Sequence, residues 1–169
     1  MELMWNYDLD AASVLLEPWS STHVWHAAAC AECSLLRTLL TGRKTDAVAT
    51  LELIKAAEVM PESMSNPLPR DVCTAEMLLM RSLLQIMLGQ RLRALYNLRA
   101  SWYAYFRLEH FLENDADLWT CSRDVECVMT YEDLRGRILF GLGFFYMATS
   151  LIPASLVPLI RLAGFVMHR

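Results

Sequence analysis

Four residues with metal-binding side chains recur at helical spacing near the start of the chain. His23, His26, Cys30 and Cys33 form the pattern HxxHxxxCxxC, and on a helix they fall within about 80° of one face. Imidazole nitrogens and thiolates are ligands that zinc takes in proteins. Since His23 and Cys33 would lie about 15 Å apart along the helix, one ion could use only three of the four. The candidate metal ligands are His26, Cys30 and Cys33.

Packing is nevertheless the favoured role for these side chains. Structural zinc sites usually draw ligands from two elements, and no second pair with suitable spacing is evident, because Cys121 and Cys127 are six residues apart in a polar stretch. Cysteine also packs as a small apolar residue. A redox role for Cys30-x-x-Cys33 is disfavoured, because the thioredoxin-type motif opens a helix after a strand. We therefore expect no metal, no other cofactor and reduced cysteines.

Other chemical signatures are weak or missing from the sequence. Gly141 and Gly143 form a GxG, but Phe, Phe and Tyr follow it, so there is no GxGxxG. The sequence contains neither GxSxG nor HExxH. The net charge is -4 and no basic run exceeds two residues, which argues against a nucleic-acid partner. We expect a protein without enzymatic activity.

Helical periodicity extends over nearly the whole chain. Three helices are expected between Asp8 and Met60: Pro18 ends the first, residues 20–22 cap the second, and Gly42 closes it before the third begins at residue 44 or 45. The stretch "PESMSNPLPR" is expected to be a linker because it holds three prolines.

Beyond the linker, helices are expected over residues 71–88 and 91–112, with Gly89 between them. Aromatic side chains occupy neighbouring positions of the second of these helices, so at least one ring should face outward; they are Trp102, Tyr103, Tyr105 and Phe106. Residues 133–169 suggest two apolar helices broken around Pro153.

An internal repeat organises these helices. "AECSLLRTLL" begins at Ala31 and "AEMLLMRSLL" begins at Ala75, so the offset is 44 residues. A repeat of this length is typical of stacked helical hairpins. In each copy we expect the alanine to allow close helix approach, and the glutamates that follow, Glu32 and Glu76, to contact a neighbouring helix or its terminus. The predicted fold is all-α, with antiparallel hairpins stacked as an α-α superhelix of about seven helices.

Residues 138–160 carry no charge and are long enough to cross a bilayer. Pro153 and Pro158 interrupt this run, and the loss of backbone donors in lipid needs repair by neighbouring helices. Two buried helices are therefore the favoured interpretation. The alternative is a tail-anchored membrane protein that uses residues 138–160 as a bilayer or lipid-surface anchor.

Three segments together resemble the tetratricopeptide-repeat protein 39 family, which includes the fungal inclusion-body clearance proteins. They are "LMWNYDLDAASVLLEP" with the two helices after it, "TAEMLLMRSLLQIMLGQRLRALYNLRASWYAYFRLE", and "GRILFGLGFFYMATSLIPASLVPLIRLAGFVMHR". The third segment resembles a glycine-rich motif of the family. The structural residues taken from the repeat and this motif are Ala31, Glu32, Ala75, Glu76, Phe140, Gly141, Gly143, Phe145, Pro153, Gly164 and Phe165.

The resemblance implies a tetratricopeptide-like scaffold that binds protein partners, with links to inclusion-body clearance and lipid homeostasis. Family members are longer, so we expect residues 1–169 to be one helical-repeat domain at the N-terminal end of a longer solenoid. Its hairpin units should span about 1–60, 70–113 and 131–169. We expect a cytoplasmic protein and keep three further interactions open: self-association, lipid binding by the apolar C-terminal helices, and attachment to an organelle membrane.

Overall fold

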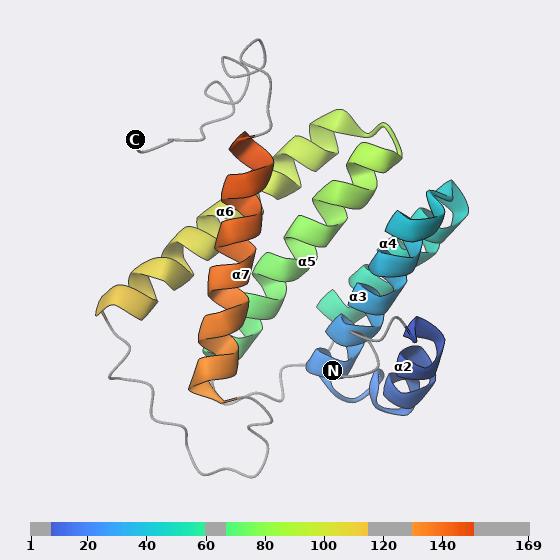
Figure 1. Ribbon diagram of the computed structural model, residues 1–169, viewed down its shortest axis with the longest axis horizontal. Coiled ribbons are helices and arrows are strands. Elements are labelled where there is room, and N and C mark those ends of the chain that lie inside the picture. The colour runs from blue at the N-terminus through green and yellow to red at the C-terminus, as the bar shows by residue number, and fades with distance from the viewer. Residues whose placement is uncertain (1–7, 60–66, 115–129, 151–169) are drawn as a thin grey trace.

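A computed structural model of the protein describes residues 8–59, 67–114 and 130–150 (Figure 1). These residues form six α-helices and one 3₁₀ helix, and they contain no strand, so the all-α prediction is confirmed. In chain order the elements are α2 (Leu9–Leu16), η1 (Glu17–Trp19), α3 (Val24–Thr41), α4 (Lys44–Glu58), α5 (Pro67–Met87), α6 (Arg91–Asn114) and α7 (Tyr131–Ser150).

Two helical hairpins, α3–α4 and α5–α6, form the centre of the fold. Each turn contains a glycine with positive φ, Gly42 at 65° and Gly89 at 74°, a conformation that residues with a Cβ rarely adopt. The Gly42 N–H donates to the Thr38 carbonyl at 2.9 Å and closes α3. The predicted helix break at each glycine is thus confirmed, because the left-handed conformation ends the helix.

The predicted start of the α5 helix at residue 71 was wrong. The helix begins at Pro67, inside the proline-rich stretch that the sequence suggested as a linker. Pro67 and Pro69 occupy its first turn, where backbone N–H groups have no partner within the helix, so the missing donors cost nothing there.

The predicted capping of α3 by residues 20–22 was also wrong. The hydroxyl groups of Ser20 and Thr22 donate backward, to the carbonyls of Glu17 at 2.7 Å and Trp19 at 3.1 Å. His23 precedes the helix, and its side chain makes no capping hydrogen bond. These short-range bonds hold the η1 turn together, which is the alternative use of Ser and Thr hydroxyls near helix ends.

Helix α7 starts at Tyr131, two residues before the predicted start, because Thr130 caps it. The Asp133 N–H donates to Thr130 Oγ1 at 3.1 Å, and the Thr130 N–H donates to Asp133 Oδ2 at 3.1 Å. This reciprocal pair is a capping box with Asp in place of the usual Glu.

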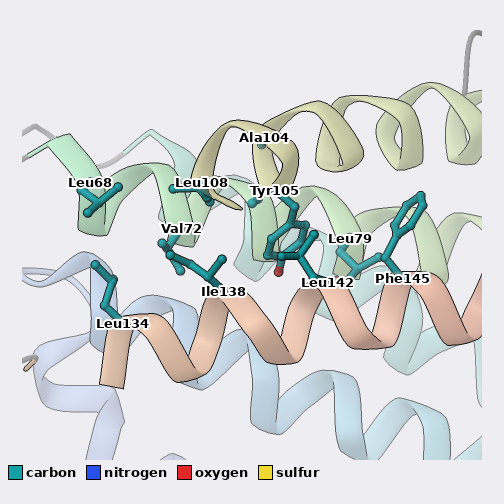
Figure 2. Packing of buried hydrophobic residues seen from close by; sticks show 11 residues of the cluster. Leu68, Val72, Leu79, Ala104, Tyr105, Leu108, Leu134, Ile138, Leu142 and Phe145 are labelled. Atoms are coloured by element: carbon teal, nitrogen blue, oxygen red, sulfur yellow. The ribbon is translucent and has the colours of Figure 1, made fainter. Parts of the chain in front are cut away.

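The helices stack in a repeating order. Helix α5 packs against both helices of the first hairpin, and α7 packs against both helices of the second (Figure 1). Figure 2 shows the apolar core between α5, α6 and α7, to which α7 contributes one stripe of buried residues, Leu134, Ile138, Leu142 and Phe145. A second core lies between α3, α4 and α5. Helix α5 therefore belongs to both cores and joins the units.

Tyr105 and Gly141 set the closest approach of α6 and α7. The Tyr105 side chain is buried in the core of Figure 2, and a Cβ added to Gly141 would overlap its ring. Gly136 lies on the exposed side of the same helix, and an added Cβ there would have no atom within 4 Å. Of the three glycines of α7, only Gly141 is thus required by a described side chain.

We predict that Gly141→Ala lowers the free energy of unfolding by about 1–3 kcal/mol, the usual cost of overpacking a core. The matched control, Gly136→Ala, should cause no loss, because alanine favours a helix over glycine by about 1 kcal/mol. Urea denaturation followed by circular dichroism measures both. Equal stability of the two variants would show that the Tyr105 ring moves aside freely.

Candidate functional site

The most distinctive polar feature of the described residues is a charge cluster that joins three helices. Arg137 Nη1 of α7 lies 3.0 Å from Glu32 Oε1 of α3 and 3.0 Å from both carboxylate oxygens of Glu76 on α5. The three side chains are only 13–24% exposed. The two glutamates of the internal repeat therefore share one arginine, which we call the Arg137 cluster.

Aromatic and sulfur-containing side chains surround the Arg137 cluster. The guanidinium carbon of Arg137 lies 5.4 Å from the ring centre of Trp25, within the range of a cation–π contact. Cys73 and Tyr105 are each 1% exposed. Burial, and next the charge of Glu76, raise the pKa of both the Cys73 thiol and the Tyr105 phenol. The cluster is accordingly enclosed by groups that stay uncharged at neutral pH.

Charge is unbalanced within the Arg137 cluster, since two carboxylates face one guanidinium. Burial opposes the charge on Arg137, but Glu76 and Glu32 outweigh it and raise the guanidinium pKa. Burial, aided by the nearby Glu32 and opposed by Arg137, raises the pKa of Glu76 to about 7. When Glu76 binds a proton, the charges of Arg137 and Glu32 cancel and the cluster has no net charge.

The candidate metal ligands do not gather into one set. His23 and His26 pack their rings against Trp19, with centroids 6.1 and 6.3 Å from it. Burial, then His23, lower the pKa of His26, and its Nδ1 is buried without a hydrogen-bond partner. Cys33 is fully buried and Cys30 partly so. Within residues 8–59, 67–114 and 130–150, no group of three His, Cys, Asp or Glu side chains is placed to hold a metal ion.

A cleft of about 510 Å³ lies between α2, η1, α3 and α4, and Cys30 lines it. Several of its polar groups already have partners within the protein. Ser13 Oγ donates to the Leu9 carbonyl at 2.7 Å, and Arg37 pairs with Asp10. Burial and next the nearby Cys33 raise the pKa of the Cys30 thiol. The cleft thus offers a thiol of low nucleophilicity.

The residues of the glycine-rich motif have different environments on α7. Phe145 is buried and Gly141 faces Tyr105, whereas Phe140 and Gly143 lie on the exposed side of the helix. Pro153, Gly164 and Phe165 lie outside the described residues. In the repeat, Ala31 and Ala75 are fully buried, and the Ala75 carbonyl accepts a hydrogen bond from Ser101 Oγ at 2.9 Å.

Arg137 is the residue of this site that sequence reasoning missed, and a signal for it exists. "GRILFGLGFF" starts at Gly136 and aligns with the two repeat copies, so Arg137 takes the position of Glu32 and Glu76. Small residues begin each copy, and a large apolar residue follows four positions later. Substitution of glycine for alanine and of arginine for glutamate obscured the third copy.

Comparison with known proteins agrees with this repeat architecture. The family model Iml2/Tetratricopeptide repeat protein 39 matches residues 1–169. The chain belongs to this family. No solved structure matches the chain.

The Iml2/Tetratricopeptide repeat protein 39 assignment agrees with the resemblance noted in the sequence and with the helical superhelix of the structure. Among the helices that the structure describes, none is both long and apolar enough to cross a membrane. In this family member the described residues form a stack of helices, three of which are joined by the Arg137 cluster.

We predict that Arg137→Ala lowers the free energy of unfolding by about 3–5 kcal/mol, because it leaves two buried carboxylates without a counter-charge. The control is Arg135→Ala, since Arg135 lies 3.7 Å from Glu132 in an exposed pair that should contribute about 0–1 kcal/mol. Urea denaturation measures both. A similar loss in the two variants would contradict a structural role for the Arg137 cluster.

The Arg137 cluster also predicts a pH dependence. Because the Glu76 pKa rises to about 7 in the folded protein, the folded state holds a proton that the unfolded state loses at lower pH. Its contribution to stability is fully present below the unfolded pKa and is lost as pH rises through about 7. The groups that face Glu76 are Glu32 from α3, Cys73 from α5, Tyr105 from α6 and Arg137 from α7.

In Glu76→Gln this contribution to the pH dependence is removed. The loss of stability between about pH 4 and pH 8, an interval that spans the unfolded and the folded pKa of Glu76, should be smaller than in the wild-type protein. Glu52→Gln, on an exposed carboxylate that pairs with Lys55, serves as the control. Urea midpoints across this range measure the effect, and parallel curves for all three proteins would refute it.

Proposed function

We propose that this chain is a non-enzymatic helical-repeat scaffold that binds a protein partner through the outer face of α6. The observation that carries the proposal is the exposure of large apolar side chains along one stripe of that helix. Leu92 is 84% exposed, Tyr96 75% and Phe106 46%. Together with the exposed Tyr103 they fall on one face at helical spacing. We call this set the α6 stripe.

Exposed rings on the α6 stripe agree with the expectation that some aromatic residues of this helix face outward. Tyr105 turns into the core, while Tyr103 and Phe106 lie at the surface. Exposed apolar patches of this kind mark interaction sites, and tyrosine and arginine are enriched at binding hot spots.

Charge around the α6 stripe suggests the chemistry of its partner. Between Arg91 and Leu108 the helix has no acidic residue, and its four arginines are exposed: Arg91, Arg93, Arg99 and Arg107. The guanidinium carbon of Arg99 lies 5.5 Å from the Tyr103 ring centre. A protein segment with apolar residues flanked by Asp or Glu complements this surface in both shape and charge.

The packing of α7 favours a scaffold over a tail anchor. Ile138, Leu142 and Phe145 belong to the uncharged run 138–160, yet they are buried against α5 and α6 (Figure 2). Insertion of this part of the run into lipid would remove these side chains from the core. We propose that the apolar residues of α7 serve internal packing, within a domain that continues as a longer solenoid.

Family membership motivates a finer role, in inclusion-body clearance or lipid homeostasis, in the cytoplasm or at the surface of an organelle. In this proposal the scaffold holds a partner of the clearance process on the α6 stripe. Cells that contain an aggregated reporter protein provide a test. Clearance should slow when the α6 stripe is changed and should stay normal when the exposed side of α4 is changed.

We predict that Tyr96→Asp with Phe106→Asp weakens partner binding about 30-fold, because loss of one hot spot costs about 2 kcal/mol. The matched control is Val48→Asp with Leu53→Asp, which alters two exposed residues of α4. Quantitative affinity purification with mass spectrometry compares the partners of the three proteins. Circular dichroism verifies that each variant is helical. Equal recovery of all partners by both variants would reject the α6 stripe as the binding face.

A further inference from the structure

An apolar patch lies exposed where α2 runs into η1. Val14 is 69% exposed, Leu15 65% and Trp19 55%, and Pro18 is exposed as well. Because η1 follows α2 without a break, residues three and four positions apart lie on the same side of this element. The four residues therefore form one surface, which we call the α2 patch.

Acidic side chains border the α2 patch. Glu17 lies three positions after Val14 and Asp10 lies four positions before it, so both carboxylates are at the same rim. The side chain of Asp8 caps the start of the helix. Arg37, which pairs with Asp10, is the first lysine or arginine in the sequence. The α2 patch thus combines apolar side chains with negative charge.

The α6 stripe has the opposite character. Its apolar side chains stand among four exposed arginines and no acidic residue between Arg91 and Leu108. A complementary segment must hold apolar residues beside Asp or Glu, and the α2 patch is a segment of this kind in the same chain. By helical rise the α6 stripe is about 21 Å long and residues 9–19 are about 15 Å long. The smaller element can therefore lie along the stripe.

The α2 patch and the α6 stripe of one folded chain are far from each other. Helix α2 packs on α3, α3 on α5 and α5 on α6, and Figure 1 shows α2 and α6 on opposite sides of the stack. Contact between two α2 patches would bring carboxylates together, and contact between two α6 stripes would bring arginines together, which like charges oppose. Only the two different surfaces of separate copies pair opposite charges.

We propose that the chain associates with itself head to tail, so that the α2 patch of one copy lies on the α6 stripe of the next. This inference rests on the proposed function for the use of the α6 stripe, and it names a second copy as the partner. The apolar side chains of both surfaces leave water in this contact, and Glu17 lies among the arginines. Because the two surfaces differ, copies add in a row or close into a ring.

Sedimentation velocity of the full chain over a concentration series tests the proposal. The patch variant is Val14→Arg with Leu15→Arg, and the stripe variant is Tyr96→Asp with Phe106→Asp. Each should associate at least about 30-fold more weakly than the wild-type protein, the effect of losing one hot spot. All four residues are exposed, so the variants should fold, and circular dichroism verifies this.

A mixture of the two variants tests the head-to-tail arrangement itself. The patch variant retains the α6 stripe and the stripe variant retains the α2 patch, so together they have one intact pair of surfaces. The mixture should form a dimer of one copy of each variant and nothing larger. The matched control, Leu40→Asp with Val48→Asp, alters two exposed residues near the α3–α4 turn and should associate like the wild-type protein.

Loss of association in both variants, together with its return in the mixture, supports the proposal. A monomeric wild-type protein, undiminished association of either variant, loss of association in the control, or a mixture that stays monomeric overturns it. The proposed function is judged separately, by the other proteins that the stripe variant fails to recover. If the wild-type protein is monomeric and the stripe variant loses such a protein, the head-to-tail contact is rejected and the binding role of the α6 stripe stands.

Discussion

The bond between Arg137 and two glutamates is the interaction on which the helical stack depends. Glu32 and Glu76 occupy equivalent positions of successive hairpins, so stacking brings two like charges together. Without a counter-charge their repulsion and burial would oppose the packing of α3 against α5. The third helix in the series carries arginine at the same repeat position and compensates both. Register between the hairpins and attachment of α7 are therefore set by the same side chain.

Local features of the fold could be predicted from the sequence. Gly42 and Gly89 indicated the hairpin turns, because glycine readily adopts the left-handed conformation that both residues have. The 44-residue repeat indicated stacked hairpins, because similar segments with the same apolar pattern form similar helices that pack against each other. The start of α5 was missed because proline has two opposite uses: it breaks a helix interior but suits a first turn.

The Arg137 cluster could not be found by local reasoning. Arg137 is 105 residues from Glu32 and 61 from Glu76, and nothing in helical periodicity connects positions so far apart. The two glutamates were recognised as structural, but their partner depends on how the third helix stacks. Gly141 illustrates the same limit, because only the position of the Tyr105 ring distinguishes it from Gly136 and Gly143 on the same helix.

The span of the Arg137 cluster bears on how such an array unfolds. In most repeat proteins each unit contacts only its neighbours, so an end unit can open while the others stay folded. Here α7 binds a carboxylate in the hairpin beside it and another in the hairpin beyond that. Detachment of α7 would remove the counter-ion from two units at once. The interaction therefore reaches past nearest neighbours and should make the separate hairpins behave as one cooperative unit.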